Sequence, residues 1–397
     1  MNKSLLTLVS ILISLLTMNA QNNDTKKGDK HFDRLEYVKA IDDYEKLVEK
    51  EKADTYVHRR LAQSYYNVYK TKKAERFYEL VVKDEENAKP SDFLQYAKTL
   101  QANGKYEEFK KAMKNFADLK PNDQRAQLFS QNPNYIDDLK EKDPKFESSK
   151  LSINSTYSDF GAYEKGGKLY FVSARNESRR DYGWNDQPTL DIYLAQNIAG
   201  TFKNPELVEG DVNTKFNEGT VAITNDNETM FFTRNAYEDG DYQKNEEGVS
   251  QLKIYQAKFV NDEWQDIKPL PFTSKDYATA NPSLGPDDKF LYFSSNMPGG
   301  FGNSDIYRVE INDDGSFGEP ENLGEKINTE GRENFPFVDK EGRLFFSSDG
   351  HLGFGGLDVF YIRLKNKDQE NPKNAAQPVN SSADDFSFSY IANKKMG

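Results

Sequence analysis

Hydrophobic residues in the first third of the chain recur at three- and four-residue steps, as on one face of a helix. The first such face carries Tyr37, Ala40, Tyr44 and Leu47. Two later segments repeat it, with Ala74, Tyr78 and Val81 in one and Phe109, Met113 and Phe116 in the other. Ala74 lies 34 residues after Ala40, and Phe109 lies 35 residues after Ala74. A helix-turn-helix period of about 34 residues is typical of tetratricopeptide repeats, so we expect such repeats over residues 21–139, capped by a helix from about Asn122 to Leu139.

From about residue 150 the pattern changes to short segments that alternate or are continuously apolar, as in β-strands. Four segments align with one another: KLYFVS at Lys168, TMFFTR at Thr229, FLYFSS at Phe290 and RLFFSS at Arg343. Each is followed by a second strand-like segment: DIYLAQ at Asp191, KIYQAK at Lys253, DIYRVE at Asp305 and DVFYIR at Asp358. Short strands repeated in units of about 40–60 residues predict a β-propeller. The aspartate that opens the later strand is expected to accept amide hydrogens from the preceding glycine turn.

A crossover segment also repeats, as NPELVEGDVNT from Asn204, EPENLGEKINT from Glu319 and QPVNSS from Gln377. The run 150–155 resembles it and is expected to start the domain with a strand of the last blade, while residues 384–389 begin a fifth unit. The predicted fold is α+β multidomain: an N-terminal α-helical tetratricopeptide solenoid, then an all-β propeller that is incomplete in this chain. We expect a signal peptide over 1–20, helical repeats over 21–139, a linker over 140–149 and blades over 150–397.

The first twenty residues predict export. A basic start at Lys3 precedes an apolar run from Leu5 to Leu16, which is too short to span a bilayer, and a weak cleavage site follows before Gln21. The chain contains no cysteine, which excludes disulfides, thiolate metal sites and a lipid-modified N-terminal cysteine. The net charge of −12 disfavours binding to nucleic acid or to anionic membranes.

The segment from Asn281 to Asp288, continued by FLYFSSNMPGGFGNSDIYRVEI, resembles the PD40 (WD40-like, TolB-type) propeller repeat. A signal peptide, tetratricopeptide repeats and PD40 blades in this order resemble the exported OmpA-family proteins of type IX secretion and gliding machinery. The resemblance implies a propeller of six blades when whole, a periplasmic location peripheral to the outer membrane, and a β-barrel outer-membrane, secretion or adhesin component as partner. The family's C-terminal OmpA-like domain, which binds peptidoglycan, has no counterpart here.

No catalytic or metal-binding pattern is visible along the chain. The histidines His31, His58 and His351 are far apart in the sequence, and both glycine-rich loops, at 299–302 and 353–356, lack the Lys-Ser/Thr of a phosphate loop. The run 312–315 is better explained as a hairpin turn than as a calcium loop. We therefore expect a protein that is not an enzyme and needs no cofactor or metal.

Surface residues are then the candidates for function. Four of them, Arg175, Asn235, Asn296 and Asp349, follow the Phe-Ser-Ser-type strand at comparable blade positions, so we expect them on one face of the propeller. Arg59 and Arg60 are expected on the concave face of the helical repeats. These six residues are the predicted partner-binding sites.

Three classes of function remain open. The leading one is a non-enzymatic periplasmic scaffold that docks outer-membrane secretion or adhesin proteins. The alternative is a propeller that binds glycans or peptidoglycan fragments, which aromatic residues on the central face would favour. An enzyme would require histidine, arginine or carboxylate side chains that converge in the central channel.

Overall fold

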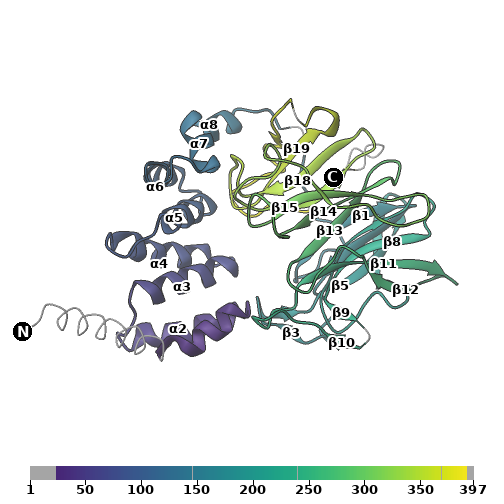
Figure 1. Ribbon diagram of the computed structural model, residues 1–397, viewed down its shortest axis with the longest axis horizontal. Helices are drawn as coiled ribbons and strands as arrows, with labels where there is room; N and C mark the ends of the chain where they lie inside the picture. The colour runs from purple at the N-terminus through teal and green to yellow at the C-terminus, as the bar shows by residue number, and fades with distance from the viewer. Residues whose placement is uncertain (1–23, 145, 239, 368, 391–397) are drawn as a thin grey trace, which may run out of the picture. The chain divides into compact units, whose positions relative to one another are not determined.

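The computed structural model of the protein describes residues 24–144, 146–238, 240–367 and 369–390 (Figure 1). The predicted signal peptide over 1–20 lies outside these ranges. The chain forms two compact units, the first made of the described residues up to Thr99 together with Tyr182–Asp186, and the second of the rest. None of the described helices is long and apolar enough to cross a membrane.

The first unit is helical. Residues 24–33 are helical and are followed by α2 (Tyr37–Glu49), α3 (Thr55–Asn67), α4 (Thr71–Lys83) and α5 (Pro90–Ala102), the last of which continues into the second unit. The residues that carry the predicted helical faces form its core, with Ala40, Tyr44, Ala74 and Tyr78 almost fully buried. The sequence pattern of this region is therefore confirmed at the level of helices and their buried faces.

The second unit opens with three helices, α6 (Tyr106–Leu119), α7 (Gln124–Gln131) and α8 (Tyr135–Lys140). The expected single helix from Asn122 to Leu139 is wrong, because it is broken between α7 and α8. Pro133 disfavours helical geometry at the residue before it, and Asn132 indeed leaves the helical region at φ −141° and ψ 77°. The side chain of Gln101 donates to the carbonyl oxygen of Gly353 at 2.6 Å, so the helices are tied to the sheets within this unit.

Sixteen strands of the second unit form four antiparallel four-stranded sheets. The first sheet contains β1 (Asp159–Lys165), β2 (Lys168–Ser173), β5 (Asp191–Ile198) and β6 (Thr201–Leu207). The second contains β7 (Glu218–Ile223), β8 (Thr229–Asn235), β11 (Leu252–Val260) and β12 (Glu263–Pro269). The third contains β13 (Thr279–Leu284), β14 (Phe290–Ser295), β15 (Asp305–Glu310) and β16 (Glu321–Asn322). The fourth contains β17 (Glu333–Val338), β18 (Arg343–Ser348), β19 (Asp358–Arg363) and β20 (Lys373–Asn374).

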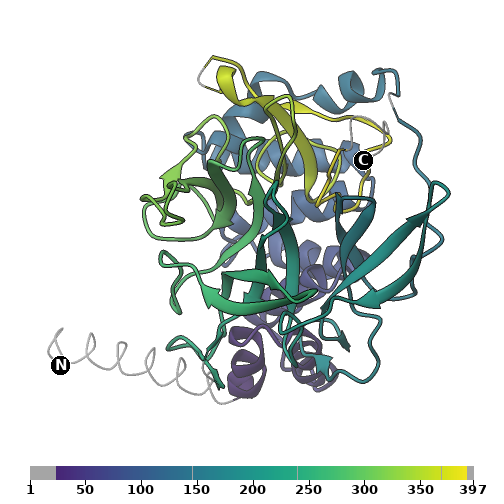
Figure 2. The same cartoon turned by 90° about the vertical axis from the view of Figure 1, so that its right-hand side faces the viewer.

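All eight strand segments that the sequence predicted are strands in the structure, and they form the middle two strands of every sheet. Figure 2 shows the four sheets following one another around a common centre, in colours that run from teal to yellow. Their first strands, β1, β7, β13 and β17, contact each other in succession. The arrangement is a propeller-like ring of four blades.

Short elements complete the unit. Two ladders of two strands each lie in the loops of the first two blades, β3 (Asp181–Tyr182) with β4 (Gln187–Pro188) and β9 (Tyr237–Glu238) with β10 (Asp241–Tyr242). A 3-10 helix, Leu364–Asn366, follows β19. The expected strand at 150–155 is wrong: the side chain of Asn154 accepts from the backbone N–H of Leu151 and closes a turn instead. Residues 384–389 likewise form no strand.

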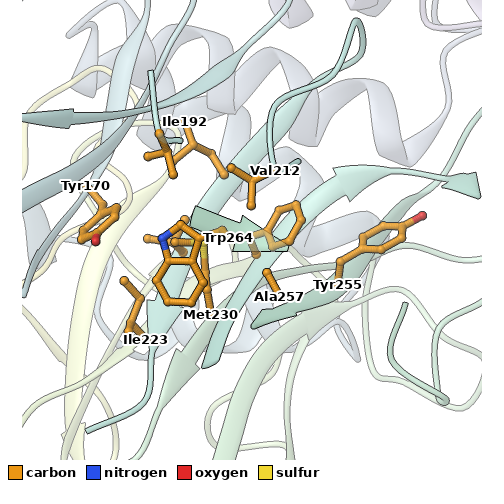
Figure 3. Packing of buried hydrophobic residues seen from close by; sticks show 11 residues of the cluster. Tyr170, Ile192, Val212, Ile223, Met230, Tyr255, Ala257 and Trp264 are labelled. Carbon is orange, nitrogen blue, oxygen red and sulfur yellow. The ribbon is translucent and has the colours of Figure 1, made fainter. Parts of the chain in front are cut away.

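Neighbouring blades share apolar cores. Between the first two blades, Tyr170 and Ile192 pack with Met230, Tyr255 and Trp264, and Figure 3 shows these side chains converging from both sheets. Equivalent cores lie between the second and third blades around Phe293 and between the third and fourth around Phe346. Each large buried side chain contributes roughly 1.5–3 kcal/mol, so blade stacking is the main source of stability in this unit.

Candidate functional site: the central face of the propeller

A motif, Asn-Ser/Thr-x-x-x-Asp/Glu, leads into the innermost strand of the first, second and fourth blades (β1, β7 and β17) and recurs after the fourth blade. It occurs four times, at Asn154-Ser155 with Asp159, Asn213-Thr214 with Glu218, Asn328-Thr329 with Glu333, and Asn380-Ser381 with Asp385. In every copy the backbone N–H and the hydroxyl of the Ser or Thr donate to the carboxylate four residues later. The third blade differs, since buried Thr279 takes the place of the acid. The motif fixes the point at which each inner strand starts.

The asparagine of the motif joins this loop to the third strand of the preceding blade. Asn328 accepts from the N–H of Ile306 at 2.8 Å and donates to its carbonyl at 3.0 Å. Asn213 and Asn380 make the same pair of bonds with Ile192 and Val359. The carboxamide thus replaces a strand in the ladder. It pairs the N–H of the third strand, which would otherwise be buried without a partner, and adds a second donor to the C=O, which also accepts a backbone N–H.

Burial strongly perturbs the motif carboxylates. It raises the pKa of Glu333 to about 8, against hydrogen bonds from Ser348 and Thr329 that lower it. Burial also raises the pKa of Glu218 to about 7, although Arg234, with Nε 3.3 Å from the carboxylate, favours the charged form. The pKa of Asp385 is raised to about 6 for the same reason. Three of the four motif carboxyl groups therefore have raised pKa values. Burial also acts to raise the pKa of Asp159, but hydrogen bonds from Ser173, Ser155 and Arg175 outweigh it and lower that pKa.

Each inner strand has a β-bulge directly after the motif carboxylate. The bulged residue has a positive φ in the first, third and fourth blades, where it is Gly161, Asn281 and Phe335, and the same conformation is found at Ser387. Glycine and asparagine adopt this conformation readily, but a bulky residue does so only against strain. Phe335 at φ 52° is therefore the unusual member of the set.

A pocket of ≈350 Å³ lies where the inner strands begin. Its lining combines phenylalanine with amides and hydroxyls: Phe160, Phe335, Asn281, Ser294, Asn296, Asn303, Ser304 and Asn334 are among its residues. Half-buried Phe160 and Phe335 contact each other edge to face, with ring centroids 6.2 Å apart, and both contact Phe386. We call Phe160, Phe335 and Phe386 the phenylalanine cluster.

The predicted surface residues Asn235, Asn296 and Asp349 occupy equivalent positions, as expected, and they share a structural task. Each side chain accepts a hydrogen bond from the backbone N–H of the residue that directly precedes the inner strand. The donors are Asn217, Ala278 and Arg332, respectively. In the first blade Gln187 does this for Ser158. Of the three, only Asn296 is exposed and lines the pocket.

Arg175 lies one residue later than the equivalent position and is held inside its blade. Its guanidinium donates to Asp159, to Ser173 and to the carbonyl of Ile153, and it stacks over the ring of Phe171. The arginine therefore fixes the first inner strand, and the structure does not bring it to the pocket.

The two arginines of the helical unit also have intramolecular partners. Arg59 forms a bidentate ion pair with buried Asp92 at the start of α5. Arg60 lies 4.2 Å from the ring centroid of Phe32 and donates to the hydroxyl of Tyr56. Neither arginine shares a site with the propeller residues.

The third-strand aspartates follow the predicted pattern in two blades. Asp305 accepts from the N–H groups of Phe301 and Gly302, and Asp358 accepts from those of Phe354 and Gly355. In the first blade Asp191 instead pairs with Arg179. The predicted turn chemistry is therefore confirmed for the third and fourth blades only.

The histidine and metal candidates give no site. His351 is partly buried and contacts the rings of Phe346 and Phe360, and its Nε2 lies 2.9 Å from the carbonyl oxygen of Ile327. Desolvation lowers the pKa of its ring to about 4. Within the described ranges, no three His, Asp or Glu side chains are grouped so that they could hold a metal ion.

The sequence interpretation did not recognise the pocket or the Asn-Ser/Thr-x-x-x-Asp/Glu motif as features of the central face. The motif could have been found, because it recurs at the end of each predicted crossover segment. The phenylalanine cluster could not, since its members come from three segments that only the ring brings together.

No known protein family matches the sequence, and no curated protein does so either. Among solved structures, similarity extends to a puromycin-hydrolysing peptidase of Mycobacterium tuberculosis (TM-score 0.32, 12% identity, 55% of this chain and 30% of that one). It also extends to an α-L-arabinofuranosidase from Lactobacillus brevis (TM-score 0.35, 13% identity, 50% of this chain and 65% of that one). A thermostable family-43 glycoside hydrolase is similar as well (TM-score 0.36, 13% identity, 58% of this chain and 76% of that one). The chain thus matches less than two thirds of the length of the first two.

These neighbours correct one expectation. The three structures are enzymes, so the prediction that the protein is not an enzyme is contradicted. That prediction rested on the lack of a catalytic pattern along the sequence. At TM-scores of 0.32–0.36, the similarity carries no argument about which reaction or substrate would be involved.

Proposed function

We propose that the protein is an exported, periplasmic binding scaffold that docks proteins of an outer-membrane secretion or adhesin assembly. The order of a predicted signal peptide, helical repeats and PD40-like blades supports this proposal. Helices α2 to α5 each have 13 residues, and their cores repeat with the period of tetratricopeptide units. Helical repeats of this kind work by holding segments of other polypeptides.

One observation carries the proposal: the helical unit holds a non-helical segment of polypeptide, Tyr182–Asp186. The indole of Trp184 donates to the carbonyl of Asn67 at 2.8 Å and contacts the ring of Tyr37 edge to face at 4.9 Å. Gly183 lies against the side chain of Glu36. An aromatic anchor with one directed hydrogen bond is a common feature of peptide recognition, so we infer that partner segments bind to this surface.

The test is affinity capture of the tagged chain from cell-envelope extract, with mass spectrometry of the proteins that co-purify. We expect a β-barrel outer-membrane protein or a secretion component. The variant Trp184→Ala vacates the surface and should increase recovery of that partner at least about twofold, because the internal segment no longer competes. As a control, Phe259→Ala removes a 41% exposed ring of the second blade and should leave recovery unchanged.

Recovery of no envelope protein would contradict the scaffold. Equal recovery with Trp184→Ala and the original chain would show that partners do not use the surface that holds Tyr182–Asp186.

A further inference from the structure

The pocket at the centre of the propeller has an almost uncharged lining. Of the side chains that the structure describes around it, Glu218 is the only ionisable one, and it is buried and paired with Arg234. Among the described residues, no lysine, arginine or histidine lines the pocket, so none of them would neutralise a phosphate or carboxylate ligand there. At ≈350 Å³ it falls at the lower end of the range of about 300–1,000 Å³ that is typical of small-molecule sites.

Two amides of the lining have donors to spare. Asn296 uses its Oδ1 to accept the N–H of Ala278 at 2.7 Å, and Asn334 uses its Oδ1 to accept the hydroxyl of Ser304 at 2.6 Å. In the part of the chain that the structure describes, neither Nδ2 group donates a hydrogen bond to the protein. Each carboxamide is therefore held in place and still presents N–H donors.

Phe335 lies at the edge of the same pocket in a strained conformation. A left-handed backbone costs a residue other than glycine roughly 1–2 kcal/mol. The equivalent positions of the first and third inner strands hold Gly161 and Asn281, and Ser387 has the same conformation after the fourth blade. The backbone alone would favour one of those residue types. Strain of this kind persists where the side chain has a use, and the ring of Phe335 lies beside those of Phe160 and Phe386.

We propose that this pocket binds one or two pyranose rings of a neutral oligosaccharide. A sugar ring has an apolar C–H face that packs on phenylalanine, and hydroxyl groups at its edge that accept from amide N–H. The rings of Phe160 and Phe335 and the free amide donors of Asn296 and Asn334 provide these contacts together. The proposal concerns the propeller alone, so it is independent of protein docking by the helical unit.

The chain offers two substitutions that leave the fold intact. Phe335→Gly removes the ring and places at φ 52° the residue type best suited to it. Asn296→Asp keeps the oxygen that accepts the N–H of Ala278 and removes the Nδ2 donors, and Asp349 already performs this task in the fourth blade. Phe301→Ala is the control, since this ring is 48% exposed and does not line the pocket.

The experiment is isothermal titration calorimetry of the full chain with maltotriose, cellotriose, mannotriose and chitotriose, and with trigalacturonate as a charged probe. We expect saturable binding of at least one neutral trisaccharide and none of trigalacturonate. Phe335→Gly should weaken binding at least about tenfold and Asn296→Asp at least about threefold, while Phe301→Ala binds as the original chain does.

Three results would overturn the proposal: no heat of binding with any of the neutral trisaccharides at about 10 mM, binding of trigalacturonate in preference to them, or affinity unchanged in both pocket variants. Far-ultraviolet circular dichroism of each variant verifies folding before titration. A chain that captures envelope proteins but binds no trisaccharide would leave the scaffold proposal standing and reject this one.

Discussion

Glu218 and Glu333 start equivalent strands, but they are stabilised differently. The partner across the ladder is Arg234 for Glu218 and Ser348 for Glu333. An arginine compensates a buried carboxylate by its charge, whereas a serine only by a hydrogen bond. Glu333 therefore has the higher pKa, about 8 against about 7, and is the better residue for testing whether the buried acids control stability.

Stability should depend on the protonation of Glu333. Its carboxyl group has a pKa of about 8 in the folded chain, against the ordinary value of 4.5 expected for the unfolded chain. Between pH 4.5 and pH 8 the folded state therefore binds one proton that the unfolded state has released. The free energy of unfolding must then fall as the pH rises through this range. Glu333→Gln stays neutral at every pH and should reduce this loss by on the order of 1–3 kcal/mol between pH 5 and pH 8, measured by urea denaturation.

Glu325→Gln is the matched control for this measurement, since Glu325 is exposed. If Glu333→Gln and the original chain lost stability equally over this pH range, Glu333 would not be protonated in the folded state.

Among the elements, the crossover loops are unusual because side chains complete their hydrogen bonding. In the third blade, β16 has only two residues, and Asn328 then takes over the pairing with β15. Its Nδ2 group also donates to Asn322, and the residue is fully buried. The asparagine connects the end of one blade to the start of the next.

Asn328→Ala should therefore lower the free energy of unfolding more than most substitutions of a polar residue by alanine do. It leaves the N–H of Ile306 buried without a partner, while the C=O still accepts from the backbone N–H of Leu323. We expect the free energy of unfolding to fall by about 1–3 kcal/mol. Denaturant titration checks this value, with Asn312→Ala in an exposed hairpin as control, for which we expect a change below about 1 kcal/mol. A small effect at Asn328 would mean that water or a backbone shift replaces its carboxamide.

On the scale of the whole molecule, the blades of the second unit depend on each other because their cores are shared. Phe293 is fully buried and contacts Phe272 and Tyr307 in the core between the second and third blades. Phe231 and Ile254 of the second blade belong to the same core. Removing one ring therefore weakens two sheets directly and the ring of sheets as a whole.

Phe293→Ala should cost about 3–5 kcal/mol, as cavity-forming substitutions of phenylalanine do. Because the sheets form a continuous stack, we expect amide hydrogen exchange to become faster in β2 and β18 as well as in β14. Exchange detected by mass spectrometry measures this. Faster exchange confined to β14 would show that the blades open independently.

The sequence by itself determined the local elements. The helical faces of α2, α4 and α6 and the middle strands of all four blades follow from periodic burial, a property of neighbouring residues that needs no knowledge of distant contacts. It also determined that Asp305 and Asp358 would hold their glycine turns, since donor and acceptor lie within four residues of each other.

Only the tertiary structure decided the rest, because the partners are far apart along the chain. In the first blade, Gln187 accepts the backbone N–H before the inner strand, as Asn235, Asn296 and Asp349 do in the other blades. The segment Tyr182–Asp186 belongs to the helical unit, although the residues before and after it belong to the first blade. Arg59, a predicted partner-binding residue, forms an ion pair with Asp92, which lies 33 residues further along the chain. The central pocket depends on where several inner strands meet, and that position is set by blade packing and not by any single segment.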